Sequence, residues 1–207
     1  YNMQTEISPT DKSRDRILSS AALLFCEYGY AGVSMRKIAE NCEMKAGSLY
    51  YHFTSKDQIL TEVLNIGIKK VHAAVANALS DTPKDALATD KLRLAVSGHL
   101  HALLENSSFT SANVRIFRQV PGEIQRSNLD VRRSYEALWD RFLSELKEAG
   151  HLRGDVDPRS LRLMLIGALN ATLEWFDPKL GEIAELADRY TDILANGMLA
   201  ELSLIHI

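Results

Sequence analysis

Apolar residues recur every three or four positions along almost the whole chain, and this spacing limits the possible folds more than any other feature. It gives each helix one apolar face, whereas a half-buried strand needs strict alternation of apolar and polar residues. We find no alternating run bounded by turn residues. The spacing therefore predicts an all-α protein.

Three short helices are expected at the N-terminus. The first spans roughly residues 11–28 and ends at Gly29, a residue type that adopts a left-handed helix end at low cost. Ser34 is placed to cap a second helix of about two turns, and a third helix lies within 45–53. A long amphipathic helix follows from about 55 to 79. The apolar face expected for the first helix consists of Ile17, Ala21, Leu24, Phe25 and Tyr28.

Five further helices are expected in the rest of the chain, separated by proline and glycine. Their ranges are roughly 84–106, 110–119, 122–149, 158–176 and 182–200. This predicts an N-terminal three-helix domain at 10–56 and a larger helical domain at 57–201. The first eight or so residues and the last six carry no helical signals, so we expect them to lie outside the native fold.

Composition excludes several classes of protein. The 207 residues are 46% apolar and 25% charged, which fits ordinary cores and excludes disordered and fibrous chains. The two cysteines cannot form a disulfide framework, and no Cys/His cluster has zinc-ligand spacing. No run of 18 apolar residues and no signal-peptide pattern is found. We therefore expect a cytoplasmic protein with no metal, no cofactor and no membrane partner.

Net charge at first argues against a nucleic-acid partner, because the formal value is −3 and the isoelectric point is near 6.1. The distribution along the chain changes this reading. Residues 10–56 hold seven Lys/Arg and five Asp/Glu, a net +2, so the remainder has 17 basic and 22 acidic residues, a net −5. The small N-terminal domain is basic and the larger domain is acidic.

Residues 34–53 have the parts of a helix-turn-helix, which needs a supporting helix, a tight turn and a second helix that reaches DNA bases. Gly47 and Ser48 are small enough for the second helix to approach DNA closely. Arg36 can reach a guanine edge, while tyrosine hydroxyls, His52 and Lys56 suit phosphate oxygens. The core expected for this motif consists of Ile38, Ala39, Met44, Leu49 and Phe53.

An ordinary helical hairpin with a solvated basic face is the alternative for 34–53, because many hairpins have this period. Resemblance favours the DNA-binding reading. The runs Ser34–Ala39 and Gly47–Lys56, together with the first helix ending at Phe25 to Gly29, resemble the TetR family of transcriptional regulators over about 50 residues. The resemblance implies an all-α homodimer of about nine helices per chain, with a variable C-terminal ligand domain and a fourth helix that couples ligand to DNA.

Two residues depart from the family pattern. Glu43 stands where the turn usually has glycine, so we expect a non-glycine residue in a left-handed conformation. Lys45 stands where Ser or Thr often caps the recognition helix, which removes a cap worth about 1 kcal/mol but adds a cation near DNA. The DNA-binding residues predicted from this segment are Ser34, Arg36, Lys45, Ala46, Gly47, Ser48, Tyr50, Tyr51, His52 and Lys56.

The segments 132–139 and 165–176 are apolar on more than one face, so something besides their own chain must bury them. In the family, the last two long helices form a four-helix dimer bundle, which would place two reading heads one DNA turn apart, roughly 34–36 Å, on a palindromic operator. Gly167, Ala168 and Ala171 would permit close helix approach. The seam would come from Leu161, Leu165, Leu194 and Met198.

A long apolar pocket with polar entrances is also expected in the larger domain. Taken one residue at a time, the aromatic side chains are better interpreted as core and the arginines as surface. The segment from Arg132 to Pro178 resembles regulators of fatty-acid and steroid-ring catabolism that respond to acyl-CoA thioesters. That resemblance implies that Arg115, Arg118 or Arg162 meets CoA phosphates. The predicted ligand-binding residues are Arg115, Arg118, Trp139, Asn170, Glu174 and Trp175.

Function classes can be ranked from these observations. An enzyme has least support, because no catalytic constellation, phosphate-binding loop or metal clamp is found. A purely structural helical protein leaves the run Gly47–Phe53 unexplained. We expect a ligand-responsive DNA-binding regulator, a repressor released from its operator by an apolar or acyl-CoA-type effector. The alternative is a regulator of drug efflux that senses a hydrophobic drug.

Overall fold

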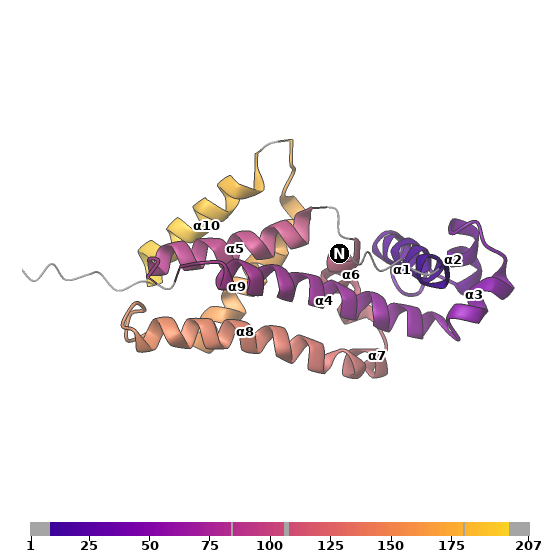
Figure 1. The fold of residues 1–207 in the computed structure, drawn as a ribbon, viewed down its shortest axis with the longest axis horizontal. Helices are drawn as coiled ribbons and strands as arrows, with labels where there is room; N and C mark the ends of the chain where they lie inside the picture. The colour runs from indigo at the N-terminus through magenta and orange to yellow at the C-terminus, as the bar shows by residue number, and fades with distance from the viewer. Residues whose placement is uncertain (1–8, 84, 106–107, 180, 199–207) are drawn as a thin grey trace, which may run out of the picture. The chain divides into compact units, whose positions relative to one another are not determined.

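The computed structural model describes residues 9–83, 85–105, 108–179 and 181–198, which form ten α-helices and one 3-10 turn (Figure 1). The predicted all-α fold is confirmed. None of the described helices is both long and apolar enough to cross a membrane. The helices are α1 (Pro9–Tyr28), α2 (Met35–Asn41), α3 (Ala46–His52), α4 (Lys56–Ser80), α5 (Ala88–Leu104), α6 (Ser108–Ile116), η1 (Phe117–Gln119), α7 (Gly122–Ser127), α8 (Leu129–Glu148), α9 (Pro158–Trp175) and α10 (Ile183–Met198).

Two compact units divide the chain. Unit 1 combines residues 1–68 with 107–130, and unit 2 combines 69–106 with 131–207. The domain boundary predicted from the sequence, between residues 56 and 57, lies at the start of α4. Unit 1 instead continues to Ile68 and also includes the segment 107–130. Both α4 and α8 contribute residues to each unit.

Unit 1 has one core, to which α1–α4, α6 and α7 all contribute. Leu49 and Phe53 of the third helix are buried beside Ile38 and Ala39, as predicted, and Met44 packs against this cluster. Tyr28 was predicted to share the apolar face of α1, but it is 46% exposed. It is the last residue of the helix, where the following Gly29 turns the chain away with φ +66°.

One predicted helix, 122–149, is in fact two. α7 ends at Ser127, and the following Asn128 is completely buried and donates from Nδ2 to Asn65 Oδ1 of α4 at 2.6 Å. The Asn128 backbone amide bonds to the Gln125 carbonyl three residues back, at 3.2 Å, and α8 restarts at Leu129. The extra break accounts for ten α-helices in the described residues where the resemblance implied about nine.

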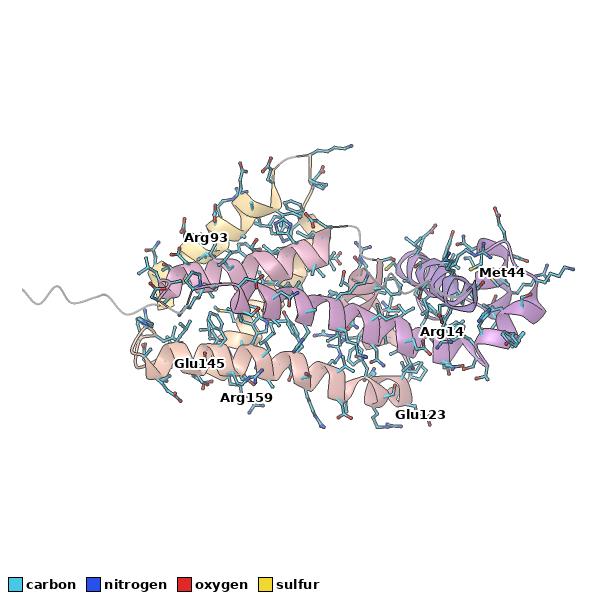
Figure 2. The ribbon with its side chains drawn as sticks, viewed as in Figure 1. Arg14, Met44, Arg93, Glu123, Glu145 and Arg159 are labelled. Atoms are coloured by element: carbon cyan, nitrogen blue, oxygen red, sulfur yellow. The ribbon has the colours of Figure 1, made fainter. Side chains whose placement is uncertain are left out.

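Unit 2 consists of helices that pack lengthwise. α10 lies along α5 (Figure 1), and Arg93 of α5, labelled in Figure 2, bridges them through its Nε, 2.9 Å from Asp188 Oδ1. Asp157 caps α9 by accepting from the Ser160 amide, with Pro158 in the first turn. α8 ends at Gly150, where the predicted break is confirmed by a φ of +75°.

Candidate functional site

The α2–α3 segment begins with a complete N-terminal cap. The hydroxyl of Ser34 accepts a hydrogen bond from the Lys37 amide at 3.2 Å, which confirms the predicted cap. Ile38 and Ala39 face the core, so the opposite side of this short helix is exposed. Arg36 lies on that exposed side and ion-pairs with Glu40 through Nε at 2.7 Å.

The turn between α2 and α3 is tight and strained at one residue. Glu43 has φ +54°, the only positive value among the described non-glycine residues. The Met44 amide, labelled in Figure 2, donates to the Ala39 carbonyl at 2.9 Å, and Glu43 donates to Glu40 at 3.1 Å. The first bond is the six-to-one pairing of a Schellman helix end, which places Glu43 at the position that favours glycine. The left-handed conformation predicted for this residue is confirmed.

α3 is only two turns long, yet both of its ends are held. Lys45 is its N-cap and makes no side-chain capping bond, as predicted. Its carbonyl accepts from Ser48 and Leu49, so the backbone still starts a helix. At the other end Phe53 is buried. The outward face has open space around Gly47, where an added Cβ would meet nothing within 4 Å.

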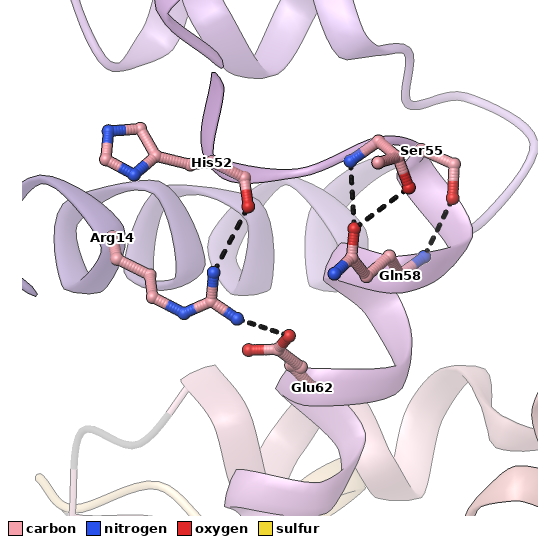
Figure 3. Close-up of polar contacts among 6 residues, drawn as sticks. Arg14, His52, Ser55, Gln58 and Glu62 are labelled. Carbon is pink, nitrogen blue, oxygen red and sulfur yellow. Dashed lines mark hydrogen bonds and ion pairs between the residues drawn. The ribbon is translucent and has the colours of Figure 1, made fainter. Parts of the chain in front are cut away.

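Arg14 of α1 fixes the end of α3 against α4 (Figure 3). Its guanidinium donates to the His52 carbonyl at 3.2 Å, ion-pairs with Glu62, and lies 4.2 Å from the centre of the Phe53 ring. One planar cation therefore satisfies a helix-end carbonyl, a carboxylate and an aromatic face. Arg14 is not among the functional residues predicted from the sequence, although its position three residues before Ile17 on the apolar face of α1 could have indicated it.

The beginning of α4 carries its own polar anchors. Ser55 Oγ accepts from the Gln58 amide, and Gln58 Oε1 accepts from the backbone and hydroxyl of Thr54 (Figure 3). Lys56 Nζ donates to the Tyr30 carbonyl at 3.0 Å and lies over the Tyr30 ring. Lys56 therefore anchors α4 to the end of α1.

The structure brings together the ten predicted DNA-binding residues within 34–56. Most are solvent-exposed, while His52 and Lys56 are half-buried. Tyr51 is 81% exposed and its ring packs edge-on against His52. Lys37, which the prediction left out, is held over the Tyr28 ring at 2.9 Å. The exposed members are Ser34, Arg36, Lys45, Ala46, Gly47, Ser48, Tyr50 and Tyr51.

Unit 2 contains a buried polar chain that the sequence did not indicate. His99 of α5 is 1% exposed; its Nδ1 lies 2.6 Å from the Tyr135 hydroxyl and its Nε2 lies 3.3 Å from Asn170 Oδ1. Burial lowers the pKa of His99 to about 4, so the ring is neutral at physiological pH. Burial likewise raises the pKa of Tyr135. The chain joins α5, α8 and α9.

The predicted ligand-binding residues have different positions. Trp139 is fully buried and Asn170 is half-buried, both in unit 2. Trp175 is 55% exposed and contacts the Tyr190 ring, and Glu174 is exposed. Arg115 and Arg118 are exposed residues of unit 1. In the described residues, no three Asp, Glu, Cys or His side chains could hold a metal ion.

Arg162 was expected near CoA phosphates, but it is buried and occupied by carboxylates. Its Nε lies 2.7 Å from Asp140 Oδ1, and its Nη1 lies 3.4 Å from Glu136 Oε2. Removing both carboxylates would leave an unpaired charge in a site with 8% side-chain exposure. This arginine therefore ties α9 to α8 and has no free face for a phosphate.

Exposed small and apolar residues lie along α9, and one exposed apolar residue, Ile193, lies on α10. Leu161 and Leu165, expected at a dimer seam, are instead buried in their own chain. Leu194 is half-buried, and the Met198 side chain lies outside the described residues. We call the exposed set the α9–α10 apolar face; it consists of Leu163, Met164, Gly167, Ala168, Ala171, Trp175 and Ile193.

Comparison with known proteins matches both parts of the chain to one family. Residues 17–63 match "Bacterial regulatory proteins, tetR family", and residues 85–198 match "Tetracyclin repressor-like, C-terminal domain". The Fatty acid metabolism regulator protein of Bacillus subtilis (strain 168) is 23% identical over 185 residues, which cover 88% of this chain and 94% of that protein.

Two solved structures share the fold. AibR in complex with isovaleryl coenzyme A and operator DNA has a TM-score of 0.76 at 24% identity, covering 87% of this chain and 97% of AibR. FadR from Bacillus subtilis in complex with stearoyl-CoA has a TM-score of 0.74 at 22% identity, covering 90% and 98%. At these identities the likeness establishes the fold alone. The two family matches together establish that this chain belongs to the TetR family of transcriptional regulators, whose members are not enzymes.

Proposed function

We propose that the chain is a ligand-responsive repressor that binds a palindromic operator as a homodimer. The observation that carries this proposal is the exposed outer face of α3, which combines open space at Gly47 with the side chains of Lys45, Ser48 and Tyr50. Such a short helix, held at its end by Arg14, can enter a major groove while small residues let the backbone approach. The family membership supports the same reading.

In this proposal, different residues contact the DNA bases and the DNA phosphates. Arg36 is exposed and its one ion-pair partner among the described residues is the exposed Glu40, so it can exchange Glu40 for a guanine edge. Lys45 has no side-chain bond to its own helix and suits a phosphate. Lys56 is bonded to Tyr30, so replacing it would disturb the fold as well as any phosphate contact.

Selection of duplexes from a random library with the full chain tests the DNA-binding role and supplies the operator. Arg36→Ala should weaken binding to the selected site more than binding to random DNA, because a base contact is lost. Lys45→Ala should weaken both about equally and reduce the salt dependence by about one phosphate contact. Failure to enrich any sequence would contradict the proposal, and equal losses for Arg36→Ala on both DNAs would remove its base-reading role.

The α9–α10 apolar face supports the homodimer. Leu163 and Met164 are 59% and 57% exposed, and exposed apolar patches of this kind mark interaction sites. Gly167, Ala168 and Ala171 leave room for a second helix to approach. Sedimentation velocity should find a dimer for the wild type and a monomer for Leu163→Glu/Met164→Glu. Leu94→Glu, at an exposed position of α5, is the matched control and should stay dimeric; a dimeric double variant would contradict this interface.

An acyl-CoA is the effector class that we propose. It is supported by the bound ligands of the two structural neighbours and by the mostly apolar interior of unit 2. Binding would favour the state that releases DNA, with a coupling of typically about 1–3 kcal/mol, through a shift of α4. Calorimetric titration with isovaleryl-CoA and stearoyl-CoA, with and without operator, tests this. Binding of a hydrophobic drug alone would favour the drug-efflux alternative.

A further inference from the structure

The ion pair between Arg36 and Glu40 of α2 uses only one donor of the arginine. The Nε–H of Arg36 donates to Glu40 Oε1 at 2.7 Å, and no other hydrogen bond or ion pair of this guanidinium is found within the described residues. A guanidinium has five N–H donors, so the four on its two Nη atoms are left for another acceptor. Arg36 can therefore reach a guanine with or without releasing Glu40.

The Arg36–Glu40 pair is poorly placed to stabilise the helix that carries it. Arg36 lies in the first turn of α2 and Glu40 in the last, so the cation is at the positive end of the helix dipole and the anion at the negative end. Pairs four residues apart stabilise a helix better in the opposite order, with the acid first. The side chains are also 86% and 61% exposed, and an ion pair in water contributes little to folding.

The carboxylate of Glu40 is also unfavourable for DNA binding in general. It is exposed in the segment proposed to approach DNA, where it repels the phosphates of any duplex. The charge therefore weakens binding to all sequences and adds little to the fold. A role toward Arg36 explains an acid at this position. A bond to Nε fixes the plane of the guanidinium and leaves the end formed by Nη1 and Nη2 available.

We infer that Glu40 is a positioning residue, which orients Arg36 so that Nη1 and Nη2 donate to O6 and N7 of a guanine. This inference rests on the proposed operator binding. Glu40 keeps its bond to Nε in this arrangement and touches no base itself. Two donors match the two acceptors of guanine, whereas adenine has an amino group, itself a donor, beside its N7. Glu40 thus raises the preference for guanine over adenine at one base and lowers the affinity for random DNA.

Fluorescence anisotropy with the full chain separates positioning from charge. The base concerned is the one whose preference Arg36→Ala removes in the selection. The probes are the selected operator, the same duplex with adenine at that base in one half-site, and a random duplex. Wild type should prefer guanine by roughly 5- to 150-fold, the range for a bidentate contact. Glu40→Met should reduce this preference by about threefold or more, yet bind random DNA more tightly.

Two variants that remove only the charge are the controls. Glu40→Gln keeps an acceptor for Nε, so it should retain more of the guanine preference than Glu40→Met does. Glu43→Gln removes an exposed acid three residues further along the chain. It should tighten binding to all three duplexes by the same factor, because a general charge effect does not depend on the base.

The results distinguish this inference from the proposed function. Full guanine preference in Glu40→Met would overturn the inference and leave operator binding intact. Tighter binding of Glu40→Met to all three duplexes by one factor would also overturn it, since Glu40 would then act through its charge alone. An equal loss of affinity for all three would assign Glu40 to the fold of α2 instead. If wild type selects no sequence, the proposed function fails, and this inference fails with it.

Discussion

Arg14 of α1 ion-pairs with Glu62 of α4, and the same guanidinium donates to the carbonyl of His52 at the end of α3. A single side chain therefore connects three helices of unit 1, including the helix that we propose enters DNA. The two charged side chains are about two-thirds buried, with exposures of 35% and 30%, so solvent screens this pair less than a surface pair. Lysine lacks the planar fork that reaches both acceptors.

Replacing Arg14 with methionine should lower the free energy of unfolding by ~1–2 kcal/mol, because a helix-end carbonyl and a carboxylate both lose their donor. Operator affinity should fall as well, since the end of α3 is no longer fixed. Urea unfolding and operator titration measure the two effects. Arg14→Lys should recover only part of either loss.

Arg16→Met is the control for this change, because Arg16 lies on α1 and is exposed. It should change the free energy of unfolding by less than ~0.5 kcal/mol. If Arg14→Met were equally mild in urea, the contact would contribute nothing to the fold. If it reduced stability but not affinity, the role of Arg14 in positioning α3 would be wrong.

Glu43→Gly should stabilise the protein by about 0.5–1 kcal/mol, because glycine adopts φ +54° without the steric cost that a side chain incurs. The gain is smaller than the full strain, since glycine also increases the entropy of the unfolded chain. Chemical denaturation measures it. Glu43→Ala keeps the Cβ and is the matched control, for which no gain is expected. A loss of stability in the glycine variant would mean that the Glu43 side chain makes a stabilising contribution of its own.

Local features of this fold could be predicted from the sequence. The Ser34 cap, the left-handed Glu43 and the uncapped Lys45 each depend on a few neighbouring residues, so residue type at a given spacing is enough to predict them. The break at Asn128 could not be predicted in this way. There Asn128 is buried against Asn65, 63 positions earlier, and periodicity does not contain that information.

The candidate sites also differ in whether they depend on neighbouring residues or on residues far apart in the sequence. The DNA-facing residues lie in one contiguous segment, so sequence reasoning could place them together. The polar chain of unit 2 joins His99, Tyr135 and Asn170 from three helices, and no local pattern indicates it. Leu161 and Leu165 were wrongly predicted to lie at a dimer seam, because their helix is apolar on several faces. The spacing of apolar residues along α9 could not decide which of its faces is buried within the chain. In the structure, the face that carries Leu161 and Leu165 is the buried one.

Gly47→Ala should separate stability from DNA binding. Alanine favours a helix interior over glycine by up to ~1 kcal/mol, and the added Cβ meets no atom within 4 Å, so the free energy of unfolding should rise. Affinity for the selected operator should fall, because the methyl group stands between the α3 backbone and the groove. Urea unfolding and fluorescence anisotropy on labelled duplexes test both. Unchanged affinity would show that this face of α3 does not approach DNA closely.

The buried His99 makes stability depend on pH. The pKa of His99 is about 4 in the folded chain, compared with the ordinary value of 6.5 expected on unfolding. Between these values the unfolded chain binds more protons, so the free energy of unfolding falls as the pH drops from 6.5 toward 4, by up to ~3 kcal/mol from this group. Above pH 6.5 the contribution is complete and constant. Tyr135 and Asn170, which contact the ring, stay uncharged throughout this range.

His99→Gln removes the titrating group while keeping a side chain that can form hydrogen bonds. At pH 7 the variant should be less stable than wild type, because the fit between Tyr135 and Asn170 is lost. The difference should shrink as the pH falls toward 4.5, since only wild type loses the histidine contribution. Urea unfolding at pH 7, 6, 5 and 4.5 measures this difference, in which the titration of carboxylates common to both proteins cancels. His151→Gln, at an exposed position, should track wild type at every pH. A gap between His99→Gln and wild type that stays constant over this range would show that His99 is protonated as readily in the folded chain as in the unfolded one.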